Sequence, residues 1–109
     1  MKKKFRVRKN EEFSRIIAEK HSISSAVFVV YHSPKKEEYC RVGISVSKKL
    51  GNAVERNRIK RQIREMLKDI LDFETCPEDL VVIARIAYLK NGFSDNKNDL
   101  ECNIKKVII

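Results

Sequence analysis

The chain has few of the residues on which several classes of protein depend. Its three cysteines form no CxxC pair, so the sequence indicates neither a disulfide framework nor a zinc site. Its three glycines are too few and too scattered for a phosphate-binding loop or a dinucleotide fingerprint. No apolar run approaches the ~20 residues that span a bilayer, and the basic N-terminus lacks the apolar region of a secretory signal. We therefore expect a cytoplasmic protein with buried or inert thiols.

Groups that could catalyse a reaction are also scarce. The histidines His21 and His32 are linked to no cysteine or carboxylate pattern, so we interpret them as surface or strand residues. The adjacent acids at 11–12 and 37–38 stand at the expected ends of elements, where they cap or are solvated. A nuclease that uses two Mg²⁺ ions needs several converging carboxylates. We predict no catalytic residue and no metal site in this chain.

Charge is the most informative property of the composition. At 109 residues, with 36% charged and 42% hydrophobic residues, the chain has the composition of one globular domain, residues 1–109. Lys and Arg outnumber Asp and Glu by 24 to 15, a net charge of +9. Such an excess predicts an anionic partner, and nucleic acid and an anionic membrane are the two candidates. The absence of tryptophan disfavours a membrane surface.

Most of the positive charge lies in one stretch, Lys48–Lys68, with the sequence KKLGNAVERNRIKRQIREMLK. The spacing of its apolar residues predicts a helix, which Asn52 can cap. The side of this helix that would pack on a core consists of Ile59, Ile63, Met66, Leu67 and Ile70. The adjacent side carries Arg56, Asn57, Lys60, Arg61, Arg64 and Lys68.

Crowding of like charge on this helix opposes folding. Cations four residues apart, such as Arg56 and Lys60 or Lys60 and Arg64, repel each other by a few tenths of a kcal/mol per pair. A bound polyanion would remove the repulsion, and this favours a nucleic-acid partner. The alternative is a solvated charged face, which basic helices often present.

The stretch Lys48–Glu65 resembles the signature of the protein subunit of bacterial ribonuclease P. That signature is a basic, Gly-containing loop, then Ala-Val, then Arg-Asn-x-x-Lys-Arg-x-x-Arg. Its members here, in register without a gap, are Lys48, Lys49, Gly51, Ala53, Val54, Arg56, Asn57, Lys60, Arg61 and Arg64. The flanking segments KNEEF, FVVY, RVGISVS and DLVVIAR agree with the family, so the resemblance covers most of the chain.

The resemblance implies an RNA-binding protein cofactor of a ribozyme. In that family an RNA holds the Mg²⁺ ions and removes the 5′ leader of precursor tRNA, while the protein binds the catalytic RNA and the leader. The chain would then be a component of an endoribonuclease, with no cofactor of its own and no obligatory protein partner. Two other interpretations stay open: a generic nucleic-acid-binding module and an amphipathic protein of the membrane surface.

The resemblance also implies which residues bind RNA. The expected RNA-binding residues are Lys48, Lys49, Asn52, Arg56, Asn57, Arg58, Lys60, Arg61, Arg64 and Lys68. The leader cleft would have Arg56, Asn57, Lys60 and Arg64 on one wall and Phe13, Ile17 and Tyr31 on the other. Ile17 stands where the family usually has a phenylalanine. Packing in the core is the alternative for each of these last three residues.

Patterns elsewhere predict an α+β sandwich of one sheet with helices. We expect a helix over Glu11–Glu19 capped by Asn10, an antiparallel hairpin of Ala26–His32 and Tyr39–Ser47, a strand over Leu80–Ala87 with neighbours on both edges, and a last helix capped by Ser94 or Asp95. The segment Lys2–Lys9 is either an extended arm on the domain or a frayed terminus.

The resemblance adds two features to this fold. A short strand near Ile23 gives the order α-β-β-β-α-β-α with a four-stranded sheet. The β-α-β crossover is left-handed in that family, whereas general chirality rules predict a right-handed crossover in about 98% of cases.

Overall fold

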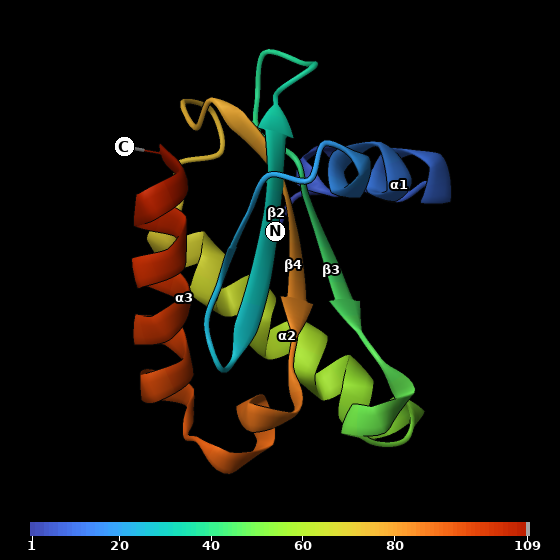
Figure 1. The fold of residues 1–109 in the computed structure, drawn as a ribbon, viewed down its shortest axis with the longest axis vertical. Helices are drawn as coiled ribbons and strands as arrows, with labels where there is room; N and C mark the ends of the chain where they lie inside the picture. The colour runs from blue at the N-terminus through green and yellow to red at the C-terminus, as the bar shows by residue number, and fades with distance from the viewer. Residues whose placement is uncertain (109) are drawn as a thin grey trace.

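The computed structural model describes residues 1–108 and confirms the predicted α+β fold (Figure 1). Its elements follow the predicted order, including the short strand at Ile23. They are α1 (Asn10–Ala18), β1 (Ser22–Ser24), β2 (Phe28–Pro34), β3 (Val42–Val46), α2 (Ala53–Ile70), β4 (Glu78–Ala84) and α3 (Phe93–Ile108). Short 3₁₀ helices cover Lys3–Phe5, Lys48–Leu50 and Ile86–Lys90.

The four strands form one mixed sheet in the order β1-β2-β4-β3. β4 pairs antiparallel with β2 and parallel with β3. The predicted hairpin of β2 and β3 is therefore wrong, because β4 lies between them. The physical reason is the apolar run Leu80–Ala84 of β4. Every residue of this run except Ile83 is at most 3% exposed. Such a strand is most stable with neighbours on both edges, which is the environment that its sequence predicts.

The β3–α2–β4 crossover is left-handed. Leu80 packs in the same core as α2, and its N–H donates to the Arg41 carbonyl at 2.9 Å, on the β3 side. When a strand of L-residues runs upward and a side chain points toward the viewer, the N–H and C=O groups of that residue point to the right. With α2 in front, β3 therefore lies to the right of β4. Figure 1 shows the opposite view, with both arrows downward, β3 on the right and α2 behind. The chain thus follows the exceptional hand.

Helix α2 forms as its sequence predicts. Asn52 accepts a hydrogen bond from the Glu55 N–H at 2.9 Å, and the Glu55 carboxylate accepts one from the Asn52 N–H at 3.3 Å, which completes a capping box. The apolar residues Ile59, Ile63, Met66 and Leu67 are at most 1% exposed. They pack with α3 against one face of the sheet and form the main core.

The other face of the sheet is covered by α1. Ile16 is fully buried there and packs with Val7 and Val81, while Phe13 and Tyr31 border this smaller cluster. Because a nine-residue helix covers only part of a sheet face, the side chains on the β3 side remain accessible between α1 and α2.

The N-terminal segment is an extended arm that lies on the domain. Phe5 and Val7 are 7% and 6% exposed, and the Val7 N–H donates to the Val42 carbonyl at 3.0 Å. A parallel bridge pairs Arg6 with Val42, so the arm runs along the free edge of β3. This settles the choice between arm and frayed terminus in favour of the arm.

Several predicted boundaries are wrong. The strands expected over Ala26–His32 and Tyr39–Ser47 run over Phe28–Pro34 and Val42–Val46. Asn10 does not cap α1, because the helix begins at Asn10 and Lys9 occupies the cap position without a side-chain bond. α3 begins at Phe93, so Ser94 and Asp95 lie inside its first turn instead of capping it. The chain leaves β4 after Ala84 and turns into a 3₁₀ helix, since Ile86 is exposed and has no place in the sheet.

Candidate nucleic-acid interface

The basic edge of α2 carries cations that no carboxylate of residues 1–108 neutralises. The side chains of Lys48, Lys49, Asn52, Asn57, Arg58, Arg61 and Lys68 are exposed, and those of Arg56, Lys60 and Arg64 are half-buried. None of the eight cations in this set forms an ion pair with a carboxylate of residues 1–108. The predicted RNA-binding residues are thus available to an anionic partner.

A hollow of about 350 Å³ lies where the basic edge of α2 approaches α1 across β3. We call it the α1–α2 hollow. Its walls include Phe13 and Ile17 of α1, Lys60 of α2 and Ser45 of β3 between them. The remaining lining residues are Asn10, Ile44, Val46 and Ile83. The structure therefore brings together three predicted cleft residues, Phe13, Ile17 and Lys60, that are up to 47 positions apart in the sequence.

A smaller hollow of about 80 Å³ adjoins it and concentrates positive charge. Arg6, Lys60 and Arg64 line it together with Phe13 and apolar residues of the arm and β3. Burial lowers the pKa of Arg64, and the charge of Arg6 lowers it further. A bound anion would relieve this repulsion. The sequence prediction missed Arg6, although the alternation of Phe5 and Val7 with Arg6 indicates that Arg6 points away from the core.

Three predicted cleft residues do not line these hollows. Tyr31 lies on the α1 face of the sheet, between Ser22 of β1 and Val81 of β4, and is half-buried against the small cluster. Arg56 and Asn57 lie one turn of α2 before Lys60 and are absent from both linings. The predicted cleft is therefore centred on Phe13 and Lys60, and a contribution of Tyr31 to it stays a prediction.

Phe13 owes its position to a glycine in β3. A Cβ atom built on Gly43 would lie 2.5 Å from Cε1 of the Phe13 ring, which no side chain could occupy without displacement. The ring therefore lies directly on the backbone of Gly43 and also borders both hollows. Glycine inside a strand often marks such a close approach, so the two interpretations of Phe13, packing and cleft lining, both apply.

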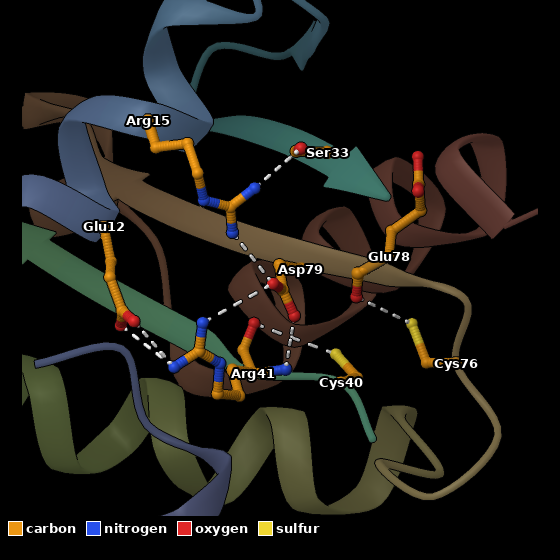
Figure 2. Close-up of polar contacts among 8 residues, drawn as sticks. All are labelled: Glu12, Arg15, Ser33, Cys40, Arg41, Cys76, Glu78 and Asp79. Carbon is orange, nitrogen blue, oxygen red and sulfur yellow. Dashed lines mark hydrogen bonds and ion pairs between the residues drawn. The ribbon is translucent and has the colours of Figure 1, made fainter. Parts of the chain in front are cut away.

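A partly buried polar network holds α1 in place (Figure 2). Arg41 donates to both carboxylate oxygens of Glu12 at 3.0 Å. Arg15 donates to Asp79 at 3.0 Å and to the Ser33 hydroxyl at 3.1 Å, and Asp79 is fully buried. The backbone N–H of Arg41 also donates to Asp79 at 3.0 Å. The interpretation of Glu12 as a capping or solvated acid is therefore wrong, since it fixes α1 to the segment that leads into β3.

Burial by itself would lower the pKa of Arg41, but the hydrogen bond and charge of Glu12 and the charge of Asp79 raise it above its ordinary value. These contacts engage Glu12 and Asp79 with arginines of the chain itself. The network is thus a structural clamp that determines where Phe13 and Ile17 stand.

Other polar side chains, among them the histidines and cysteines, make contacts of their own. His32 Nδ1 lies 2.8 Å from Glu78 Oε1, a pairing that the sequence pattern does not reveal. Cys40 and Cys76 are buried as predicted, whereas Cys102 is exposed. The Cys40 thiol donates to the Arg41 carbonyl at 3.9 Å and the Cys76 thiol to the Glu78 carbonyl at 3.6 Å. Residues 1–108 contain no group of three or more His, Cys, Asp or Glu that could hold a metal ion. None of the helices over these positions is long and apolar enough to cross a membrane.

Comparison with known proteins agrees with the geometry. The model of the family described as Ribonuclease P matches residues 1–108. A ribonuclease P protein component from Mesoplasma florum is 46% identical over 103 residues, with 92% of each chain covered. One from Exiguobacterium is 52% identical over 85 residues, covering 78% of this chain and 74% of the relative.

Solved structures give the same result. An RNase P protein from Staphylococcus aureus superposes with a TM-score of 0.83 at 42% identity, with 94% of each chain covered. The RNase P protein from Thermotoga maritima gives a TM-score of 0.71 at 27% identity, also with 94% of each chain covered. Fold, basic helix and sequence therefore agree, and the chain belongs to the ribonuclease P protein family.

Proposed function

We propose that this chain is the RNA-binding cofactor of a cytoplasmic ribonuclease P ribozyme, and that it binds both the catalytic RNA and the 5′ leader of precursor tRNA. Membership of the family supports a role in the processing of tRNA 5′ ends. The observation that carries the finer proposal is the α1–α2 hollow, in which an aromatic ring, apolar side chains and a cation meet beside a row of unneutralised cations.

The catalytic RNA is the partner that we assign to the exposed cations. Lys48, Lys49, Arg58 and Arg61 extend into solvent from the start and outer side of α2. Phosphates on a folded RNA are closely spaced, and each contact releases counterions, which makes such a row of cations favourable for binding. The interaction is then strongly dependent on salt.

The leader is the partner that we assign to the α1–α2 hollow. A single-stranded leader offers unpaired bases that can stack on Phe13, and base–aromatic stacking contributes about 1–3 kcal/mol per base. Lys60 and Arg64 stand beside the ring, where they can bind leader phosphates. Ile17 supplies an apolar surface without a ring, so the stacking contribution is concentrated at Phe13.

Catalysis is assigned to the RNA, which would hold the Mg²⁺ ions. Two acids on the α1 side of the sheet agree with this assignment, because Glu12 and Asp79 are engaged by Arg41 and Arg15 of the chain itself. The protein would act by positioning the substrate and by neutralising phosphate charge around the metal-binding RNA. We expect His21→Ala and His32→Ala to leave holoenzyme turnover unchanged apart from any effect on protein stability.

Comparison of two substrates with the reconstituted holoenzyme tests the assignment of the leader. Lys60→Ala should weaken binding of precursor tRNA with a leader of several nucleotides and leave binding of leaderless tRNA unchanged. Lys105→Ala, which removes an exposed cation from α3, is the matched control and should affect neither substrate. Equal losses of affinity for both substrates would contradict binding of the leader in the hollow. Metal-dependent cleavage by RNA-free protein would overturn the assignment of catalysis to the RNA.

A further inference from the structure

A third hollow lies on the other flank of α2, away from the α1–α2 hollow. It has a volume of about 250 Å³ and lies between α2, the 3₁₀ helix Ile86–Lys90 and the start of α3. We call it the α2–α3 hollow. It is lined by Arg58, Ile59, Gln62, Tyr88, Leu89, Asn91, Gly92, Phe93 and Asn96, none of which is acidic. Arg58 and Lys60 are two residues apart on a helix, hence about 200° apart around its axis, so the two hollows use different sides of the basic helix.

Hydrogen bonds hold the α2–α3 hollow in shape. Asn96 is 1% exposed and donates through Nδ2 to the Tyr88 and Asn91 carbonyls at 3.1 and 3.5 Å. The Tyr88 hydroxyl donates to Oε1 of Gln62 at 2.7 Å. The Tyr88 ring packs edge-on against Phe28 in the core, with ring centroids 5.8 Å apart. The walls are therefore preorganised, which reduces the entropic cost of binding a ligand.

One wall contains a polar atom that lacks a partner. The Oδ1 atom of Asn96 is buried and has no hydrogen-bond partner among residues 1–108. Its orientation is fixed, because the Nδ2 group of the same side chain already faces two carbonyls. A buried acceptor without a donor is unfavourable by about 1–3 kcal/mol, and such groups are uncommon in folded proteins. Oδ1 itself has almost no accessible surface, so the groups that a ligand in the hollow can reach are the other lining side chains.

The rim of the hollow combines an aromatic ring with a cation. Phe93 is 43% exposed and Leu89 is 49% exposed, and both line the same hollow. Isolated apolar residues on a surface are ordinary, but here they border a preformed hollow together with exposed Arg58. This set resembles what proteins present to an unpaired nucleotide: a ring for the base, a cation for its phosphate and amides for its edge.

We infer that the α2–α3 hollow binds one unpaired base of the catalytic RNA, with the base on Phe93 and an adjacent phosphate on Arg58. This inference rests on the proposed function. The ligand is a nucleotide rather than a peptide, because Arg58 has no carboxylate partner among residues 1–108 and the lining has no acid. The volume is below the ~300–1,000 Å³ of sites for drug-sized ligands, as suits a single base. The catalytic RNA would then contact both flanks of α2.

Equilibrium binding of the full chain to full-length catalytic RNA, measured over a range of salt concentrations, tests the inference. Phe93→Ala should weaken binding about 5- to 150-fold, the range for one stacked base, without changing the salt slope. Phe93→Tyr keeps the ring and should bind like the parent. Arg58→Ala should weaken binding and make the slope of log K against log[salt] shallower by about one unit. Ile86→Ala removes an apolar side chain of similar exposure outside the hollow and should change nothing.

A loss of folding would not explain weaker binding by Phe93→Ala, because Phe93 is half-exposed and its removal should change the melting temperature little. A photo-crosslinking side chain at position 93 gives a second measurement, and it should crosslink to an unpaired nucleotide of the catalytic RNA. Unchanged affinity of Phe93→Ala, or crosslinks only to a second copy of the chain, would overturn the inference. In both of these outcomes the parent protein still binds the catalytic RNA, whereas a parent that does not bind it would overturn the proposed function itself.

Discussion

Arg41 holds both carboxylate oxygens of Glu12 at 3.0 Å, and this pair joins the first turn of α1 to the segment that enters β3. Their side chains are only 12% and 24% exposed. The next residue after Glu12 is Phe13, whose ring lies on Gly43 and borders both hollows beside Lys60. The ion pair thus determines the position of the wall that we assign to the leader.

Removal of this pair should loosen α1. Glu12→Ala removes the nearer of the two carboxylates beside the largely buried Arg41 guanidinium and leaves Asp79 at 3.8 Å. Breaking a buried pair typically costs about 3–5 kcal/mol. We expect a loss near the lower end of this range, because the pair is not fully buried, seen as a fall in the free energy of unfolding in urea. Glu74→Ala is the control, since the Lys4–Glu74 pair is exposed and worth at most about 1 kcal/mol. Equal losses for the two variants would contradict the clamp.

Gly43→Ala should displace Phe13. The added methyl group would meet the ring at 2.5 Å, and overpacking of this kind costs about 1–3 kcal/mol. The variant should melt at a lower temperature and bind leader-bearing precursor less tightly. Phe13→Leu in the same chain should restore part of the stability. Gly92→Ala, where the methyl group meets nothing within 4 Å, is the control for the effect of a glycine substitution on stability. A Gly43→Ala protein with parental stability and affinity would show that the ring is free to move.

Tyr31→Ala distinguishes packing from leader contact. Because Tyr31 is half-buried against Ile16 and Val81 and lines neither hollow, we expect mainly a loss of stability, of about 3 kcal/mol as for large aromatic residues. Thermal melting and holoenzyme affinity for leaders of different length measure the two effects. If affinity falls only for precursor with a several-nucleotide leader and melting shifts little, Tyr31 belongs to the leader cleft after all.

Arg61→Ala tests whether the exposed side of α2 meets phosphate. The Arg61 side chain is exposed and has no ion-pair partner within residues 1–108, so its removal should not destabilise the fold. Binding to the catalytic RNA should weaken, and the slope of log K against log[salt] should become shallower by about one unit. Lys106→Ala, on the exposed side of α3, should leave the slope unchanged. An Arg61→Ala slope equal to the parental slope would remove Arg61 from the phosphate contacts.

Local signals in the sequence account for much of the fold. The spacing of Ile59, Ile63, Met66 and Leu67 and the cap at Asn52 predict α2 correctly, because both depend on residues within one element. The pairing of β2 with β3 was predicted wrongly, because adjacency in the sequence favours a hairpin and no local pattern shows that β4 inserts between them. The left hand of the crossover came from the resemblance and not from any residue pattern.

The candidate site was predictable where its residues share a motif. Lys60 and Arg64 belong to the basic helix, and the resemblance placed Phe13 and Ile17 opposite them. The clamp that holds Phe13 was not predictable, since Glu12 and Arg41 are 29 residues apart and each looks like an ordinary surface charge in the sequence. The α2–α3 hollow was missed for the same reason, because it forms only when α2 and α3 pack together.

Cleavage of precursor tRNA under multiple turnover tests the central claim most directly. The catalytic RNA is assayed at low Mg²⁺ concentration with and without this protein, and the protein is also assayed alone. We predict slow cleavage by the RNA alone, rapid accurate removal of the 5′ leader when the protein is added, and no cleavage by the protein alone. Turnover by the RNA that is unchanged by the protein at every Mg²⁺ concentration would contradict the account.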